Sequence, residues 1–172
     1  SVISSYAYSS NILNANEYII PVLNEDILKH KHLVSKIYKH LHKSCIEEFG
    51  NNVGFNYDIN KNTYQLILSK DNHKGLVVYA LYECNRKIMC GSGGCDYFII
   101  SDNKMVSGFG HKPYSEQLMN GDYVLMLPLN GGSCERSDGK ENFGADFCAS
   151  IAFWDKIHNT FISYGNILKD FH

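Results

Sequence analysis

The sequence predicts an α+β fold in which one long N-terminal helix packs on a meander of antiparallel β-strands and disulfides hold the parts together. Three observations favour it: apolar residues recur at helical spacing over 25–49, the period becomes two or gives way to short apolar runs after Gly50, and the chain has six cysteines. A length of 172 residues suits one domain. We therefore expect a single domain over 1–172, with a loosely held segment at 1–23, the helix at 25–49 and the sheet at 53–164.

The helix has signals at both of its ends. Asn24 is a suitable N-cap, and Glu25 and Asp26 follow in the first turn, where the helix dipole favours acidic side chains. Gly50 is a natural stop at the C-terminal end. Apolar side chains at steps of mostly three and four residues form one stripe, consisting of Ile27, Val34, Ile37, Tyr38, Leu41, Cys45 and Phe49.

Strands are expected wherever short apolar runs lie between turn-forming residues. They fall at 53–59, 63–69, 75–84, 95–101, 104–109, 122–129, 148–154 and 160–164. Two stretches, 108–121 and 130–146, fit neither a helix nor a strand. Because long loops in compact domains are often functional, these two are the first places to look for a site.

Charge excludes some partners. The net charge of −2 comes from 16 basic and 18 acidic residues, which leaves no electrostatic footprint for nucleic acid. The densest basic run, 29–43, is interpreted as a solvated helix face, with a binding patch as the alternative. No stretch offers 18 consecutive apolar residues, so we expect no membrane span.

The cysteine count predicts an oxidising compartment, because six cysteines are many for a reduced protein of this size. The chain starts at Ser1 without a methionine or an apolar leader. We interpret it as the mature form of an exported protein, periplasmic or secreted, although a trimmed chain would begin in the same way.

The six cysteines allow 15 connectivities, which we rank. The four small residues between Cys90 and Cys95 can close a tight loop, so this pair comes first. Cys134 and Cys148 would close the second long loop, which leaves Cys45 to pair with Cys84. Zinc-type C-x2-C spacing is absent, and one free nucleophilic thiol is the alternative.

Other catalytic and metal patterns are weak. The serine-hydrolase elbow and the phosphate-binding loops are missing, and His30, His32, His40 and His42 lack the i, i+4 spacing of helical metal ligands. The acidic side chains of the second loop could hold calcium, but a solvated acidic loop is the ordinary interpretation. We therefore expect no metal, no cofactor and no enzymatic activity.

The first long loop contains glycines, an aromatic pair, an imidazole and a hydroxyl in Ser107-Gly-Phe-Gly-His-Lys-Pro-Tyr-Ser115. A protruding loop of this composition could fill the cleft of another protein. An ordinary surface loop with Phe109 buried is the equal alternative.

Two runs resemble patterns in small exported proteins of Gram-negative bacteria. They are Cys90-Gly-Ser-Gly-Gly-Cys95-Asp-Tyr-Phe and Cys148-Ala-Ser-Ile-Ala-Phe-Trp154-Asp, with Phe161 in the last hairpin. In general style the chain is similar to periplasmic immunity proteins that neutralise cell-wall-degrading effectors of type VI secretion, and to periplasmic lysozyme inhibitors. The latter carry an S-G-x-x-Y loop, whereas here Ser107-Gly108-Phe109-Gly110 is followed by His111, and tyrosine comes only at Tyr114.

The resulting prediction is a periplasmic inhibitor that occludes the cleft of a secreted peptidoglycan hydrolase. Two alternatives remain: an exported hydrolase that uses His111 with a carboxylate or a free cysteine, and a structural or adhesive surface protein. A rigid loop loses little entropy on binding, which favours a braced loop as the inhibitory element. The expected contact residues are, first, His111, Lys112, Pro113, Tyr114 and Ser115 and, second, Glu135, Asp138, Glu141 and Asn142.

Overall fold

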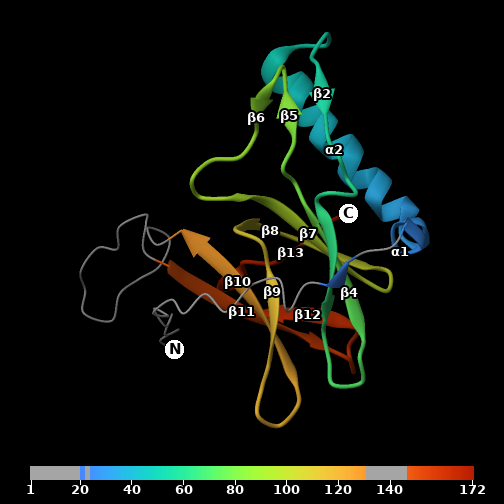
Figure 1. The fold of residues 1–172 in the computed structure, drawn as a ribbon, viewed down its shortest axis with the longest axis vertical. Coiled ribbons are helices and arrows are strands. Elements are labelled where there is room, and N and C mark those ends of the chain that lie inside the picture. The colour runs from blue at the N-terminus through green and yellow to red at the C-terminus, as the bar shows by residue number, and fades with distance from the viewer. Residues whose placement is uncertain (1–19, 22–23, 131–146) are drawn as a thin grey trace.

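A computed structural model describes residues 20–21, 24–130 and 147–172, which form two helices and three antiparallel sheets (Figure 1). About 45% of these residues lie in strands and about 20% in helices. The predicted fold, one long helix on a single meander, is therefore wrong. The protein is mainly β, and the predicted sheet is divided among three separate sheets.

The predicted helix is two helices. α1 spans Asn24–Lys29 and α2 spans Lys31–Phe49, and the backbone leaves helical geometry at His30, where φ is −107° and ψ is 18°. Neither glycine nor proline marks this break, and the apolar spacing continues through it, so the sequence carried no signal for it. α2 ends at Phe49, directly before Gly50, as predicted, and buries Val34, Ile37, Leu41 and Cys45.

The largest sheet has six strands, of which the central ones are the longest. Their order across the sheet is β1 (Ile20–Pro21), β3 (Thr63–Ile67), β4 (Lys74–Tyr79), β7 (Cys95–Ser101), β8 (Lys104–Gly110) and β13 (Lys169–Asp170). The register places Val77 opposite Ile99 between β4 and β7.

A second sheet has four strands, in the order β12 (Thr160–Ser163), β11 (Phe147–Asp155), β10 (Tyr123–Asn130) and β9 (Tyr114–Gln117). A third, small sheet joins β2 (Phe55–Asn56), β5 (Glu83–Cys84) and β6 (Lys87–Ile88). The strand predicted at 75–84 therefore forms two strands, β4 and β5, which belong to different sheets. A 3-10 turn at Tyr164–Asn166 lies between β12 and β13.

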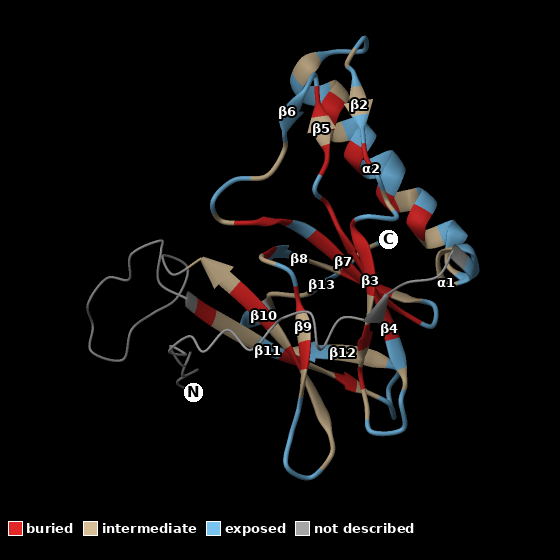
Figure 2. Cartoon of the chain, viewed as in Figure 1, coloured by how far each residue is buried: buried red, intermediate tan, exposed pale blue. Residues whose placement is uncertain are grey.

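Two hydrophobic cores lie on opposite faces of the six-stranded sheet, whose central strands are buried over most of their length (Figure 2). Ile100 and Phe98 on β7 point toward α2, whereas Ile99 and Tyr97 point toward the four-stranded sheet. Successive residues of a strand face opposite sides, so β7 contributes to both cores. The six-stranded sheet is therefore the middle of three layers.

Two of the three predicted disulfides are present among the described residues. Cys45 of α2 pairs with Cys84 of β5 at a Cα–Cα distance of 5.6 Å, and Cys90 pairs with Cys95 at 4.9 Å. Cys148 is also disulfide-bonded, and its predicted partner Cys134 lies outside the described residues. The first bridge fastens the small sheet to the helix. Such bridges are typical of proteins in oxidising, extracytoplasmic compartments.

Within the described part of the chain, no helix is both long and apolar enough to cross a membrane.

Candidate protein-binding face

The segment predicted as a protruding loop, 108–121, does not protrude over most of its length. β8 continues to Gly110 and β9 begins at Tyr114, so only a three-residue connection separates these strands. This connection is fixed by its backbone, because the His111 N–H donates to the carbonyl of Pro128 at 3.0 Å. The prediction of a long open loop here is wrong.

Two tyrosine side chains of the six-stranded sheet donate hydrogen bonds to the backbone of this connection and of the residue before it. The Tyr64 hydroxyl donates to the Pro113 carbonyl at 2.6 Å, and the Tyr79 hydroxyl donates to the Gly110 carbonyl at 2.9 Å. Burial raises the pKa of both hydroxyl groups, so they remain protonated donors. These bonds fix the backbone where the chain leaves β8 of the six-stranded sheet for β9 of the four-stranded sheet.

The five residues of the first predicted group therefore differ in access. Lys112 is exposed and its ammonium lies 5.7 Å from the centre of the Tyr79 ring, whereas His111 and Tyr114 are half-buried. Pro113 is buried, and Ser115 is 2% exposed with its hydroxyl donating to the Ile67 carbonyl at 2.7 Å. Neither buried side chain can reach a partner while β9 stays in place. The second predicted group, Glu135, Asp138, Glu141 and Asn142, lies outside the described residues.

The part of 108–121 that does protrude is the tip of the β9–β10 hairpin, which projects from the lower end of the long axis (Figure 1). The Gly121 N–H donates to the Leu118 carbonyl at 2.9 Å, and the Leu118 N–H donates to the Asp122 carbonyl at 2.7 Å. Gly121 has φ +86° with open space around it, so its backbone angle is what calls for glycine there. The side-chain amide of Asn120 makes two hydrogen bonds with Asp122, both at 3.0 Å: its N–H donates to the carboxylate, and its oxygen accepts from the backbone N–H.

Large apolar side chains stand in solvent at this end of the molecule. Met119, at the tip of the β9–β10 hairpin, has a relative exposure of 108%, and the preceding Leu118 has 45%. Ile157, in the turn between β11 and β12, is 88% exposed. Large exposed apolar patches are typical of interaction sites, whereas single exposed apolar side chains are common on protein surfaces. We call the turns 69–73, 118–122 and 155–159 together the tip face.

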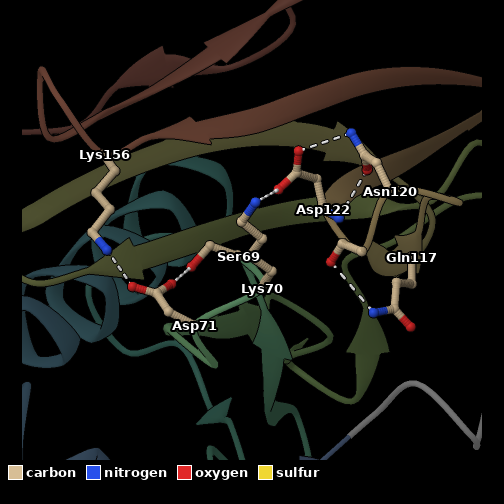
Figure 3. A network of polar contacts seen from close by, with 8 residues as sticks. Ser69, Lys70, Asp71, Gln117, Asn120, Asp122 and Lys156 are labelled. Carbon is tan, nitrogen blue, oxygen red and sulfur yellow. Dashed lines mark hydrogen bonds and ion pairs between the residues drawn. The ribbon is translucent and has the colours of Figure 1, made fainter.

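Ion pairs connect the three turns of the tip face (Figure 3). Lys70 lies 3.8 Å from Asp122, and Lys156 pairs with Asp71, which also accepts a hydrogen bond from the Ser69 hydroxyl. The turn 69–73 is thereby joined to the turns on both of its sides. Exposed ion pairs add little stability, but several together restrict the positions of the turns they connect.

The Asp71 carboxylate stays ionised over the ordinary pH range. The hydrogen bonds from Lys156 and Ser69 lower the pKa of Asp71 to about 2. In the neighbouring turn, the hydrogen bond with His158 lowers the pKa of Asp155, whose carboxylate also accepts the Ile157 N–H at 3.0 Å. The tip face therefore presents apolar side chains on turns in which the carboxylates of Asp71 and Asp155 are already bound within the chain.

A possible catalytic group occurs where β4, β7 and β11 approach each other. His73 Nε2 lies 2.7 Å from the Ser101 hydroxyl and 3.8 Å from Asp102, and the His73 ring stacks on Trp154. A nucleophilic relay needs the serine and the carboxylate on different ring nitrogens, and an accessible serine. Both contacts here involve Nε2, and Ser101 is fully buried, so this group is structural.

A nucleophilic cysteine, a metal site and a ligand pocket are the other kinds of site to consider in the described residues. The described cysteines include no free thiol, so a nucleophilic cysteine is not available there. In the same residues, no three His, Cys, Asp or Glu side chains come together as metal ligands. A hollow of about 490 Å³ lies over the small sheet, lined by Gly54, Phe55, Asn56, Glu83, Asn85 and Arg86. The Phe55 ring is stacked on His42 and makes an edge contact with Tyr38, so part of its surface is already used within the chain.

Comparison with protein-family models, with curated proteins and with solved structures finds no match to this chain.

The sequence contained a signal for the tip of the β9–β10 hairpin. Asn120-Gly121 stands between two runs that form strands, and Asn-Gly in that position is the strongest short-range hairpin signal. Because 108–121 was interpreted as one continuous loop, the hairpin that Asn120-Gly121 indicates was not predicted. The exposure of Ile157 and the connection among the three turns had no such signal, because they depend on strands distant in sequence.

Proposed function

We propose that this chain is an exported inhibitor that neutralises a secreted cell-wall-degrading hydrolase by inserting the tip of its β9–β10 hairpin into the active-site cleft. This keeps the inhibitory mechanism expected from the sequence and moves it from 111–115 to the tip face. The observation that carries the proposal is Met119, a fully exposed apolar side chain at the end of a hairpin braced by hydrogen bonds and an ion pair.

The surroundings of Met119 suit a concave partner. The charged groups on either side occur as pairs within the chain, Lys70 with Asp122 and Lys156 with Asp71, which gives an apolar centre and a polar rim of low net charge. Binding energy in protein interfaces concentrates in such central apolar anchors, while the rim excludes water. A projecting anchor needs a cleft, and the substrate cleft of a hydrolase is a recess whose occupation stops turnover.

Rigidity supports the same mechanism. A loop that is already ordered loses little conformational entropy when it binds, so more of the contact energy contributes to affinity. The β9–β10 turn is ordered by bonds from Asn120, Gln117 and the backbone. The disulfides support export, which places the inhibitor in the compartment where cell-wall hydrolases act.

The test begins with affinity capture from the periplasm and culture medium of the native host, followed by inhibition assays with the purified partner on peptidoglycan. We expect capture of a peptidoglycan hydrolase that the wild-type protein inhibits. Met119→Asp should weaken binding about 30-fold, as expected for loss of a central anchor. The matched control is Ile88→Asp, which removes another exposed apolar side chain, 57% exposed, on the small sheet at the opposite end of the molecule (Figure 1).

Three outcomes would contradict the proposal. Capture of no hydrolase would contradict the proposed class of partner. An equal loss of affinity in Ile88→Asp would show that the tip face is not the binding site. If Lys112→Ala abolished binding while Met119→Asp did not, the interface would lie at the segment first predicted. Peptidoglycan cleavage by the purified chain alone would favour the exported hydrolase instead.

A further inference from the structure

The outer face of α2 carries a continuous row of basic side chains. His32, Lys36, Lys39 and Lys43 follow one another at steps of four, three and four residues, which places them along one side of a helix. The buried residues of α2 lie on the opposite side, in the core against the six-stranded sheet. We call these four residues the basic stripe.

The charged side chains in the middle of this region are all positive. Residues 27–46 contain five lysines and no aspartate or glutamate, in a chain whose net charge is −2. Lys43 pairs with Glu47 at 3.7 Å. Among the residues that the structure describes, Lys36 and Lys39 have no carboxylate within ion-pair distance. The structure thus leaves two lysines in the middle of the stripe, Lys36 and Lys39, without a neighbouring carboxylate in the described part of the chain, although the rest of the chain is net negative.

The shape of this face indicates the form of its partner. α2 lies along the outside of the molecule, and its outer side is exposed over most of its length (Figure 2). A convex helix of 19 residues, about 28 Å long, cannot enclose a small ligand. It presents its charges along a line, which suits a flat and extended array of anions.

The stripe itself is polar. Tyr38, which is 44% exposed, lies on the other side of α2, where its ring centre is 5.0 Å from that of Phe55. Clusters of lysine are the groups with which peripheral segments bind anionic lipid headgroups, so the contact would be electrostatic. Duplex nucleic acid fits less well, because α2 contains no arginine, the side chain that most often recognises its phosphates and bases.

We infer that the basic stripe docks this protein on an anionic phospholipid surface. This goes beyond the proposed function and does not depend on it, because the stripe and the tip face belong to different layers of the fold and share no residue. Docking through α2 would leave the β9–β10 hairpin, at the lower end of the molecule, free for its partner (Figure 1). Each lysine close to an anionic surface should contribute about fivefold to affinity.

The test is co-sedimentation of the oxidised full chain with vesicles of phosphatidylglycerol and phosphatidylethanolamine, compared with phosphatidylcholine vesicles. We expect binding to the anionic vesicles alone, and its loss at high salt because salt screens the charges. The double variant Lys36→Gln/Lys39→Gln should bind about 25-fold more weakly. Its matched control, Lys74→Gln/Lys169→Gln, removes the same charge from exposed positions on β4 and β13 and should bind like wild type.

Several results would overturn the inference. Equal binding to both vesicle types, no binding at low salt, or equal weakening in the control variant would each exclude docking by the stripe. Loss of vesicle binding in Met119→Asp instead would assign the membrane contact to the tip face. Binding to soluble duplex DNA that depends on Lys36 and Lys39, without vesicle binding, would assign the stripe to a soluble polyanion. Circular dichroism of each variant shows whether it is folded.

Discussion

The hydroxyl of Ser115 connects the two large sheets. It is almost completely buried on β9 and donates to the carbonyl of Ile67 at the end of β3. Ser115→Ala leaves that carbonyl without its donor, so we expect a loss of about 1–3 kcal/mol in the free energy of unfolding. Urea unfolding measures this, with Ser92→Ala as a control at an exposed serine. An unchanged midpoint for Ser115→Ala would show that the bond contributes nothing to stability.

His30 makes the stability of the protein depend on pH. Burial lowers its pKa, and the neighbouring Asp102 only partly opposes this effect. The unfolded chain therefore binds the proton more readily, so stability is fully present above the ordinary histidine pKa of about 6.5 and decreases as the pH falls through it.

Replacing His30 by asparagine should reduce this pH dependence. We expect the difference in Tm between about pH 8 and about pH 5 to be smaller in His30→Asn than in wild type, because the titrating group is gone. Differential scanning calorimetry at the two pH values provides the comparison. An identical difference in both proteins would show that His30 does not contribute to the pH dependence.

At the scale of elements, the two described disulfides should contribute unequally. Cys45 and Cys84 are 39 residues apart and join α2 to the small sheet, whereas Cys90 and Cys95 are only five apart. A bridge that closes a longer loop restricts the unfolded chain more. We expect the loss of the first bridge to cost about 4 kcal/mol and the loss of the second about 2 kcal/mol.

The corresponding variants are Cys45→Ala/Cys84→Ala and Cys90→Ala/Cys95→Ala, compared by guanidinium unfolding. A larger loss on removal of the short bridge would mean that native packing around the CGSGGC loop, rather than loop length, determines the contribution. The helix and the small sheet are the elements to monitor, because only the first bridge joins them.

Whole-molecule stability depends on the six-stranded sheet, because it forms one wall of both cores. Ile99 and Ile100 are adjacent on β7, fully buried, and face opposite layers. Because the same strand contributes to both cores, we expect one cooperative transition. Ile99→Ala and Ile100→Ala should each cost about 2–5 kcal/mol.

Two probes report on the two sides of the molecule. Trp154 is the only tryptophan and packs in the core beside the four-stranded sheet, whereas far-ultraviolet circular dichroism follows α2 on the other side. Both variants should shift both signals by the same amount. If Ile99→Ala shifted only the fluorescence, the two cores would unfold independently.

The sequence alone determined the local features of this protein. The helical spacing over 25–49 indicated helix there, although as one helix rather than two, and the stop at Gly50 and the period of two in the later chain indicated the helix end and several strands with nearly correct boundaries. The small residues between Cys90 and Cys95 indicated a bridge that the structure contains. These features depend on neighbouring residues, which is why spacing and composition record them.

Only the tertiary structure decided how the strands divide into layers and which residues of 108–121 reach solvent. The continuous apolar runs at 76–79 and 97–100 indicate burial on both faces, but a strand cannot specify which distant element covers each face. In the same way, nothing near Ser115 shows that Ile67 is its partner, and nothing near Met119 shows that no other segment covers it. Spacing records which side of an element is apolar, whereas contacts between residues far apart in the chain decide what covers that side.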